Sequence, residues 1–383
     1  MIKNSKFDDI RPYYDDEVVG AIKRLMGDSE FQRVVKFLDP EIDWEGFKKL
    51  MYSFTNKFDF QHSIIKDTVS KIAEKTSHSS NIGGLDNVSK DGAYTYISNH
   101  RDIILDASLL CTFLSKSGYD TTEIAIGDNL LLQPWIEDIV RLNKSFIVKR
   151  GVSARQMLEV SKHLSEYIHH TIQNKKQSVW IAQRQGRAKN SDDKTQESLL
   201  KMLSMGDDKK FLASIQALNI APLSLSYEYD PSDYLKAQEF QEKRDNPEFK
   251  KSANDDLINM ETGITGYKGN IHFQVGKPIN PILEELDASI PKSELVAVLA
   301  KIIDKEIYLN YKFYPINYIA YQKLFGSAIF ADKYTKEEEE MVDSYFKTQL
   351  DKITLPQKDL PFLEQKLMEM YAFPVINYIE AKK

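Results

Sequence analysis

The chain begins with about eighty residues whose apolar positions repeat at helical spacing. Segments 16–26, 29–38 and 43–54 place apolar side chains three or four residues apart, which predicts amphipathic helices. The stretch that follows, 78–92, is rich in Ser, Asn, Asp and Gly and is typical of a loop or a domain boundary. We therefore expect a helical N-terminal region at 1–85.

Short apolar runs, rich in β-branched and aromatic residues, alternate with helical patterns after this stretch. The helical patterns lie at about 103–116 and 153–174. The runs predicted as strands are 93–98, 122–127, 145–150, 178–184, 219–228 and 269–279. This alternation predicts an α/β fold, with a mostly parallel mixed sheet and helices on both faces.

The last two predicted strands are separated by a polar, highly charged segment, 230–262. We interpret it as a solvated helix or an excursion between strands. Helical periodicity returns in 283–383, for example at 293–311 and 336–353. The chain is therefore predicted to hold an α/β domain at 86–282 between helical N-terminal and C-terminal regions.

Composition and charge narrow the classes of protein. With 42% hydrophobic and 28% charged residues the chain is an ordinary globular protein, and its net charge of -6 argues against a broad nucleic-acid-binding face. The single cysteine, Cys111, allows neither an intrachain disulfide nor a cysteine-based zinc site, which favours a reducing compartment. The charged N-terminus lacks the apolar core of a signal peptide, and no window approaches 18 apolar residues. We expect a cytoplasmic protein, which could also lie peripherally on the inner membrane surface.

A histidine follows the first predicted strand and precedes a predicted helix. His100 would then lie at the carboxyl edge of the sheet, where ligands of parallel sheets collect. Asp102 and Asp106 follow it by two and six residues, and either could hold the imidazole in one tautomer and stabilise its charged form. Such spacings often arise by chance, so the residues alone do not choose between the two partners.

Cationic side chains follow two other predicted strands. They are Lys149 and Arg150 at the end of 145–150, and Arg184, Arg187, Lys189 and Lys194 after the strand at 178–184. Guanidinium forks on loops at strand ends suit a phosphate, although a solvated basic turn is the simpler alternative. A base and two cationic groups at three strand ends suggest acyl or phosphoryl transfer on an anionic substrate.

Four segments, in order, resemble the blocks of the glycerolipid acyltransferase superfamily. YISNHRDIILD (96–106) is similar to the first block, a strand followed by H-x4-D. IAIGDNLLLQPWIEDIVRLNKSFIVKR (124–150) resembles the second block, and its GDNL start and F-I-x-x-R ending are closest to the glycerol-3-phosphate acyltransferase branch. WIAQRQGRAKNSDDKT (180–195) and IAPLSLSYE (220–228) resemble the third and fourth blocks, and FQVGKPI (273–279) resembles the family's closing strand.

The resemblance implies an enzyme of phospholipid biosynthesis. It would transfer an acyl group from acyl-CoA or acyl-carrier protein to glycerol-3-phosphate, or alternatively to lysophosphatidate or another lysolipid, without an acyl-enzyme, a bound cofactor or a metal. His100 would be the general base that takes a proton from the acceptor hydroxyl. The phosphate ligands carried over from the family are Arg150 and Arg187 as first choices, then Lys149, Lys189 and Lys194, with Arg184 as a further candidate.

Two positions depart from the family pattern. The spacing between His100 and Asp106 is one residue longer than H-x4-D. We favour Asp106 as the partner, because Leu-Asp before an apolar helix matches the family, and Asp102 would then cap the first helical turn. Arg184 stands where the family has a glutamate. Because of that change, the sequence does not determine the acceptor substrate. It also allows the alternative that the protein is a catalytically inactive relative that binds a lipid or a carrier protein.

Overall fold

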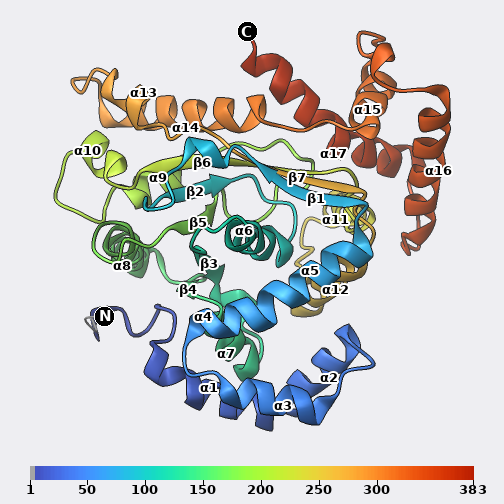
Figure 1. Cartoon of the computed structure of the whole chain (residues 1–383). Coiled ribbons are helices and arrows are strands. Elements are labelled where there is room, and N and C mark those ends of the chain that lie inside the picture. The colour runs from blue at the N-terminus through green and yellow to red at the C-terminus, as the bar shows by residue number, and fades with distance from the viewer. Residues whose placement is uncertain (1–4) are drawn as a thin grey trace.

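A seven-stranded sheet in the order β1-β7-β6-β2-β5-β3-β4 forms the centre of the molecule (Figure 1). The structure is a computed structural model that describes residues 5–383, apart from the side chains of Ala154 and Ala253. Within this range β6 and β7 are antiparallel and the other neighbouring strands are parallel. The strands are β1 (Ser79–Gly83), β2 (Thr95–Ser98), β3 (Glu123–Gly127), β4 (Ser145–Val148), β5 (Val179–Ala182), β6 (Ile220–Tyr227) and β7 (Asn270–Val275). The predicted α/β class with a mostly parallel mixed sheet is confirmed.

The six predicted strands all form, since their β-branched and aromatic residues suit a sheet that is covered by helices. All eight residues of β6 are buried, for example. The loop predicted at 78–92 is wrong for Ser79–Gly83, which form β1. β1 pairs with β7 alone at the edge of the sheet and is half-exposed, so its polar sequence gives no strand signal. The predicted boundary at residue 85 leaves this strand on the N-terminal side.

Helices cover both faces of the sheet. One face packs against α5 (Lys66–Thr76) and α6 (Leu105–Lys116), and Leu105 to Leu114 of α6 are all buried. The other face packs against α8 (Ala154–Gln173) and α14 (Lys292–Leu309). Figure 1 shows α14 and α6 on opposite sides of the sheet. Shorter helices on the α8 side are α9 (Glu197–Leu203), α10 (Phe211–Gln216) and α13 (Asn280–Glu284).

The N-terminal helices form a separate apolar cluster against α7 (Pro134–Leu142). They are α1 (Asp15–Gly27), α2 (Ser29–Leu38), α3 (Trp44–Ser53) and α4 (Lys57–Phe60). The segment before them runs along the outer strand of the sheet, where the Ile147 amide of β4 donates to the Ile10 carbonyl at 2.8 Å. The N-terminal region therefore covers the β4 edge. None of the helices within residues 5–383 has the length and apolar character that a membrane crossing needs.

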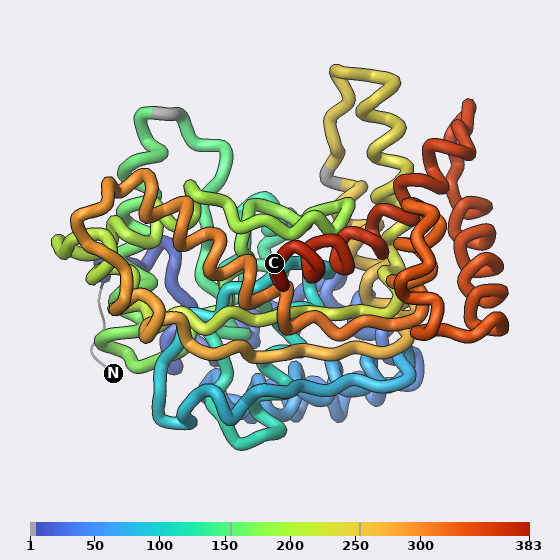
Figure 2. The backbone as a smooth tube through the Cα atoms, turned by 90° about the horizontal axis from the view of Figure 1, so that it is seen from above, coloured from blue at the N-terminus to red at the C-terminus, as the bar shows by residue number. Residues whose placement is uncertain are grey.

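The charged segment between β6 and β7 forms a helical hairpin of α11 (Asp233–Asp245) and α12 (Ala253–Thr265). Figure 2 shows this hairpin, in yellow, projecting from the body of the molecule. α11 packs against the C-terminal helices α16 (Lys336–Lys352) and α17 (Leu360–Ala381). α15 (Pro315–Phe325) completes this C-terminal cluster. The hairpin thus connects the sheet with the C-terminal helices.

Asp233 is fully buried where α11 meets α16 and α17. Its carboxylate accepts hydrogen bonds from the hydroxyls of Tyr345 and Tyr371, each at 2.7 Å, and from the Gln349 amide. Burial and the nearby charge of Asp230 raise the pKa of Asp233 to about 6. The folded protein therefore holds a proton on Asp233 that the unfolded chain has already lost at the same pH.

We expect Asp233→Asn to remove a pH-dependent part of the stability. Because the pKa of Asp233 rises from 3.8 to about 6 on folding, its contribution to stability falls as the pH rises from 4 to 6. A shift of this size is worth about 3 kcal/mol in full, of which about 2 kcal/mol should be lost between pH 4.5 and pH 7. Urea unfolding of both proteins at pH 4.5 and pH 7 measures it. An equal pH dependence in the wild type and the variant would contradict this account.

Candidate active site

The carboxyl ends of three parallel strands, β2, β5 and β4, carry the predicted site residues, and β3 lies between β5 and β4 in the sheet. His100 lies two residues after β2, Arg184 two residues after β5, and Arg150 two residues after β4. Parallel neighbours end at the same edge of the sheet, so these residues converge there. Their hydrogen bonds and ion pairs show which of these side chains lie together.

His100 is hydrogen-bonded to Asp106, with 2.7 Å between Nδ1 and Oδ2. Asp106 lies in the first turn of α6, is 1% exposed, and also accepts from the amides of Arg101 (2.6 Å) and Asp102 (3.1 Å) and the hydroxyl of Tyr227 (3.0 Å). The Arg101 and Asp102 amides donate to the Asp106 carboxylate, and we assign the Nδ1–H of His100 as a further donor to it. That tautomer leaves Nε2 with a lone pair for a substrate proton.

Two aromatic side chains fix this pair. Burial raises the pKa of the Tyr227 hydroxyl well above its usual value, and the charge of Asp106 adds to the shift, so Tyr227 remains a donor. Trp180 of β5 packs against the imidazole of His100, with 5.7 Å between ring centroids, and its Nε1 donates to Ser98 Oγ at 3.0 Å. Sequence reasoning did not single out Tyr227, although it ends the fourth block.

Asp102 makes its hydrogen bonds at the start of α6. Its Oδ1 accepts from the amides of Ile104 (2.8 Å) and Leu105 (2.7 Å). Burial, followed by the charge of Asp106, raises its pKa. A Cβ on Gly263 of α12 would lie 2.0 Å from Asp102 Oδ2, so a glycine lets the hairpin approach this turn. The turn before α6 accommodates the extra residue, and Asp102 holds it.

Arg150 lies against the start of the GDNL sequence. A Cβ on Gly127 would be 2.7 Å from Arg150 Nε, so the glycine makes room for the guanidinium. The Arg150 amide donates to Asp128 Oδ1 at 3.1 Å, whereas its guanidinium has no hydrogen bond to any residue that the structure describes. Burial lowers the pKa of Arg150, and the charges of Asp128 and Asp256 act in the opposite direction. The side chain is a partly buried cation without a bound carboxylate.

Helix α12 contacts Arg187 and lies near Arg150. Arg187 Nη2 donates to Asn259 Oδ1 at 3.1 Å, and Asp256, whose charge acts on Arg150, lies three residues earlier on α12. Residues three apart share one face of a helix. One face of α12 thus interacts with cations from two different strand ends. Sequence reasoning missed this role, because the segment 230–262 was interpreted only as solvated helix or excursion.

The other predicted cations have different surroundings. Lys189 pairs with Glu239 of α11, and burial together with the charges of Lys243 and Lys251 lowers its pKa to about 7. Lys194 is exposed and pairs with Asp192 in its own loop. These two lysines have local carboxylate partners that a substrate anion would need to displace.

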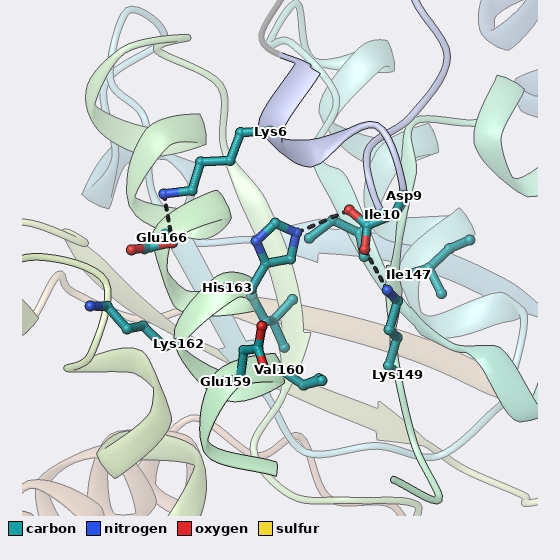
Figure 3. A pocket seen from close by; sticks show the side chains of 11 residues that line it. Lys6, Asp9, Ile10, Ile147, Lys149, Glu159, Val160, Lys162, His163 and Glu166 are labelled. Carbon is teal, nitrogen blue, oxygen red and sulfur yellow. Dashed lines mark hydrogen bonds and ion pairs between the residues drawn. The ribbon is translucent and has the colours of Figure 1, made fainter. Parts of the chain in front are cut away.

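Lys149 is directed away from this group. It pairs with Asp9 of the N-terminal segment, and Figure 3 shows both beside His163 in a pocket of about 500 Å³. Asp9 Oδ1 is also 3.0 Å from His163 Nε2. The structure therefore does not bring Lys149 together with Arg150, although the two are adjacent in sequence.

The arginines of the chain divide into two groups. Six of the ten form ion pairs with carboxylates. Four have no carboxylate partner among the described residues, and all follow β4 or β5: Arg150, Arg155, Arg184 and Arg187. Three of them, Arg150, Arg184 and Arg187, follow strand ends at the edge that holds His100, which is where a substrate anion would bind, whereas Arg155 lies on the first turn of α8. No group of His, Cys, Asp or Glu within residues 5–383 forms a metal site.

Comparison with known proteins identifies the domain that carries this geometry. Residues 79–200, from β1 to α9, match the sequence model of the family described as Acyltransferase. This part of the chain is similar to that family. The match supports the predicted acyltransferase class, and the matched residues include His100, Asp106, Arg150 and Arg187.

Other comparisons are more distant. The crystal structure of the 1-acyl-sn-glycerophosphate (LPA) acyltransferase PlsC from Thermotoga maritima is similar with a TM-score of 0.36 and 13% sequence identity. The alignment covers 75% of this chain and 91% of that chain. No curated protein is significantly similar to this sequence.

Proposed function

We propose that the protein transfers a fatty acyl group from an acyl thioester to a hydroxyl group of glycerol-3-phosphate, with His100 as the general base. The observation that carries the proposal is the His100–Asp106 pair, which lies at the same sheet edge as three arginines without ion-paired carboxylates, Arg150, Arg184 and Arg187. The similarity of residues 79–200 to acyltransferases supports the reaction class, and guanidinium groups without a bound carboxylate suit a phosphate on the acceptor.

The reaction needs only groups that the site and the substrates supply. Nε2 of His100 takes the proton of the acceptor hydroxyl while the oxygen bonds to the thioester carbonyl carbon. Collapse of the tetrahedral intermediate breaks the C–S bond, and the imidazolium returns the proton to the leaving thiolate. The Asp106 carboxylate stabilises the imidazolium between these steps. The products are an ester and a free thiol, and no bound cofactor takes part.

The test is an acceptor and donor screen with purified protein. Acyl-CoA and acyl-carrier protein would each be offered with glycerol-3-phosphate, lysophosphatidate or glycerol, and ester product would be measured. We expect the highest kcat/KM with glycerol-3-phosphate and a much lower value with glycerol, which lacks the phosphate. A preference for lysophosphatidate would move the proposal to that acceptor, since it carries the same phosphate and a free hydroxyl. No ester with any acceptor would contradict the proposal.

Arg187→Ala should raise the KM for glycerol-3-phosphate by about ten- to a hundredfold. A hydrogen bond to a charged group contributes about 1.5–3 kcal/mol, and each 1.4 kcal/mol is a factor of ten in binding. The KM for the acyl thioester should stay within about twofold, because the phosphate is on the other substrate. Arg150→Ala should behave in the same way.

Arg155→Ala is the matched control for this series. Arg155 also follows β4 and has no carboxylate partner, but it is exposed on the first turn of α8. If Arg155→Ala raised the KM as much as Arg187→Ala, the effect would be general electrostatic attraction and not binding at this edge. An unchanged KM in both Arg187→Ala and Arg150→Ala would place the phosphate elsewhere.

A further inference from the structure

Arg101, the residue directly after His100, is fixed at three points. Its amide donates to Asp106 Oδ2 at 2.6 Å, and its carbonyl accepts from Lys236 Nζ of α11 at 3.4 Å. Its guanidinium forms a two-pronged pair with Asp193, at 2.8 Å and 2.5 Å. The side chains are 9% and 1% exposed, so this ion pair lies in the interior.

Asp193 belongs to the loop that carries Arg187. Its Oδ2 also accepts from the hydroxyl of Tyr311 at 2.6 Å, and its carbonyl accepts from the hydroxyl of Tyr308. Two residues later, the amide and hydroxyl of Thr195 donate to Asp304 of α14, at 2.8 Å and 2.5 Å. This end of the loop is therefore firmly attached to the helical layer beneath it. The Arg101–Asp193 pair is the direct bond between that loop and the loop of His100.

A second support reaches Arg101 from the C-terminal helices. Lys236, whose ammonium donates to the Arg101 carbonyl, is 3% exposed and pairs with Asp230. The Asp230 amide in turn donates to the hydroxyl of Tyr371 on α17 at 3.0 Å. The turn after His100 is thus held both from α14 and from α17.

Stability alone does not account for the buried pair. Removing two charges from water costs several kcal/mol for each ion, and replacing a buried ion pair with apolar residues of similar volume is often neutral or stabilising. What such a pair does provide is a fixed geometry, because a guanidinium fork meets a carboxylate in one plane and at two points. A reaction between two held groups is sensitive to that geometry, since a misplacement of about 1 Å can cost about a hundredfold in rate.

We propose that Arg101 is a positioning residue, which through Asp193 fixes the loop of His100 relative to the loop of Arg187. The inference rests on the proposed function in that it assigns the base to the first loop and phosphate binding to the second. With the pair intact, a phosphate bound by Arg187 places the acceptor hydroxyl at Nε2 of His100. Without it the two loops can shift against each other, and the bound acceptor no longer meets the base.

The experiment removes the pair without leaving a buried charge. In Arg101→Met/Asp193→Leu/Tyr311→Phe, both charges and the hydroxyl that bonds Asp193 are replaced by side chains of similar size. Arg101→Gln/Asp193→Asn is the second variant, which also leaves no buried charge and keeps side chains of similar shape if the triple variant does not fold. In the variants that fold, we expect the KM for glycerol-3-phosphate to rise at least tenfold, with the KM for the acyl thioester within twofold of wild type.

Arg141→Met is the matched structural control. The Arg141 side chain is also buried, at 8% exposed, and it donates to the carbonyls of Asp9 and Arg11 in the N-terminal segment. We expect it to lower the thermal midpoint but to leave both KM values within twofold. An unchanged KM for glycerol-3-phosphate in the folded variants would overturn the proposal. A parallel rise of both KM values, as general loosening would cause, would also overturn it.

Calorimetry separates this inference from the proposed function. If the wild type makes no ester, binding of glycerol-3-phosphate and inorganic phosphate can still be measured without turnover. At least fivefold weaker binding by Arg101→Gln/Asp193→Asn would support the positioning role although the proposed function had failed. Equal affinity in the wild type and the variant would overturn it, and so would absence of binding by the wild type.

Discussion

His100→Ala should lower kcat for acyl transfer by about 10²–10⁴-fold while the protein remains folded. The substitution removes Nε2, the group that would take the proton from the acceptor hydroxyl. It leaves the backbone contacts of the turn in place, because Asp106 still accepts from the amides of Arg101 and Asp102. The KM for either substrate should change little, since the phosphate and the thioester bind elsewhere. Initial rates at saturating substrate, with circular dichroism to check the fold, measure the effect.

His163→Ala is a matched control for this substitution. His163 is also a partly buried histidine bonded to an aspartate, Asp9, but it lies on α8 beside the pocket of Figure 3. Its loss should leave kcat within about twofold. If His100→Ala kept a third or more of the wild-type kcat, the base would be another group. A loss of similar size in His163→Ala would point to a general effect on the fold.

Asp106→Asn should reduce kcat by about 10²–10⁴-fold, whereas Asp102→Asn should leave it within about threefold. An asparagine at position 106 can donate its amide N–H to Nδ1, which favours the tautomer with the proton on Nε2. That tautomer cannot act as a base at Nε2, and the neutral amide does not stabilise the imidazolium. Asp102 lies at the start of α6, where asparagine is about as good a cap as aspartate.

The ranking of the two variants is the decisive result. Rates at several pH values, together with thermal unfolding, would show whether a loss of activity follows a loss of the fold. A larger loss in Asp102→Asn would mean that Asp102 is the functional partner, and that the hydrogen bond between His100 and Asp106 is not used in catalysis. Equal small losses would leave the base without a carboxylate partner.

Part of this site can be predicted from the residues around His100 in the sequence. The strand before His100 is visible as a short run with β-branched and aromatic residues, and it is buried throughout. The preference for Asp106 over Asp102 rests on the family resemblance of Leu-Asp before an apolar helix, and the structure begins α6 at Leu105. β1 escapes prediction for the converse reason, since a half-exposed strand at the edge of a sheet needs no apolar run.

Contacts between residues that are far apart in the sequence cannot be predicted in this way. Tyr227 lies 121 residues from Asp106, and Asp193 lies 92 residues from Arg101, and only the folded chain brings them together. Lys149 and Arg150 show a related limit. Adjacent side chains at the end of a strand point to opposite sides, so only one of two neighbouring cations can face the site. The sequence does not say which one, and the structure directs Lys149 to Asp9.

The N-terminal segment that lies along β4 limits how far the protein can be shortened. β4 is an outer strand of the sheet, and the Ile10 carbonyl occupies the amide of Ile147. A polypeptide trimmed to the matched residues 79–200 would retain His100, Asp106, Arg150 and Arg187 but would expose this amide along an open, apolar strand. Open strands of this kind pair with other chains and promote aggregation. The N-terminal segment thus covers a strand edge that would otherwise be open.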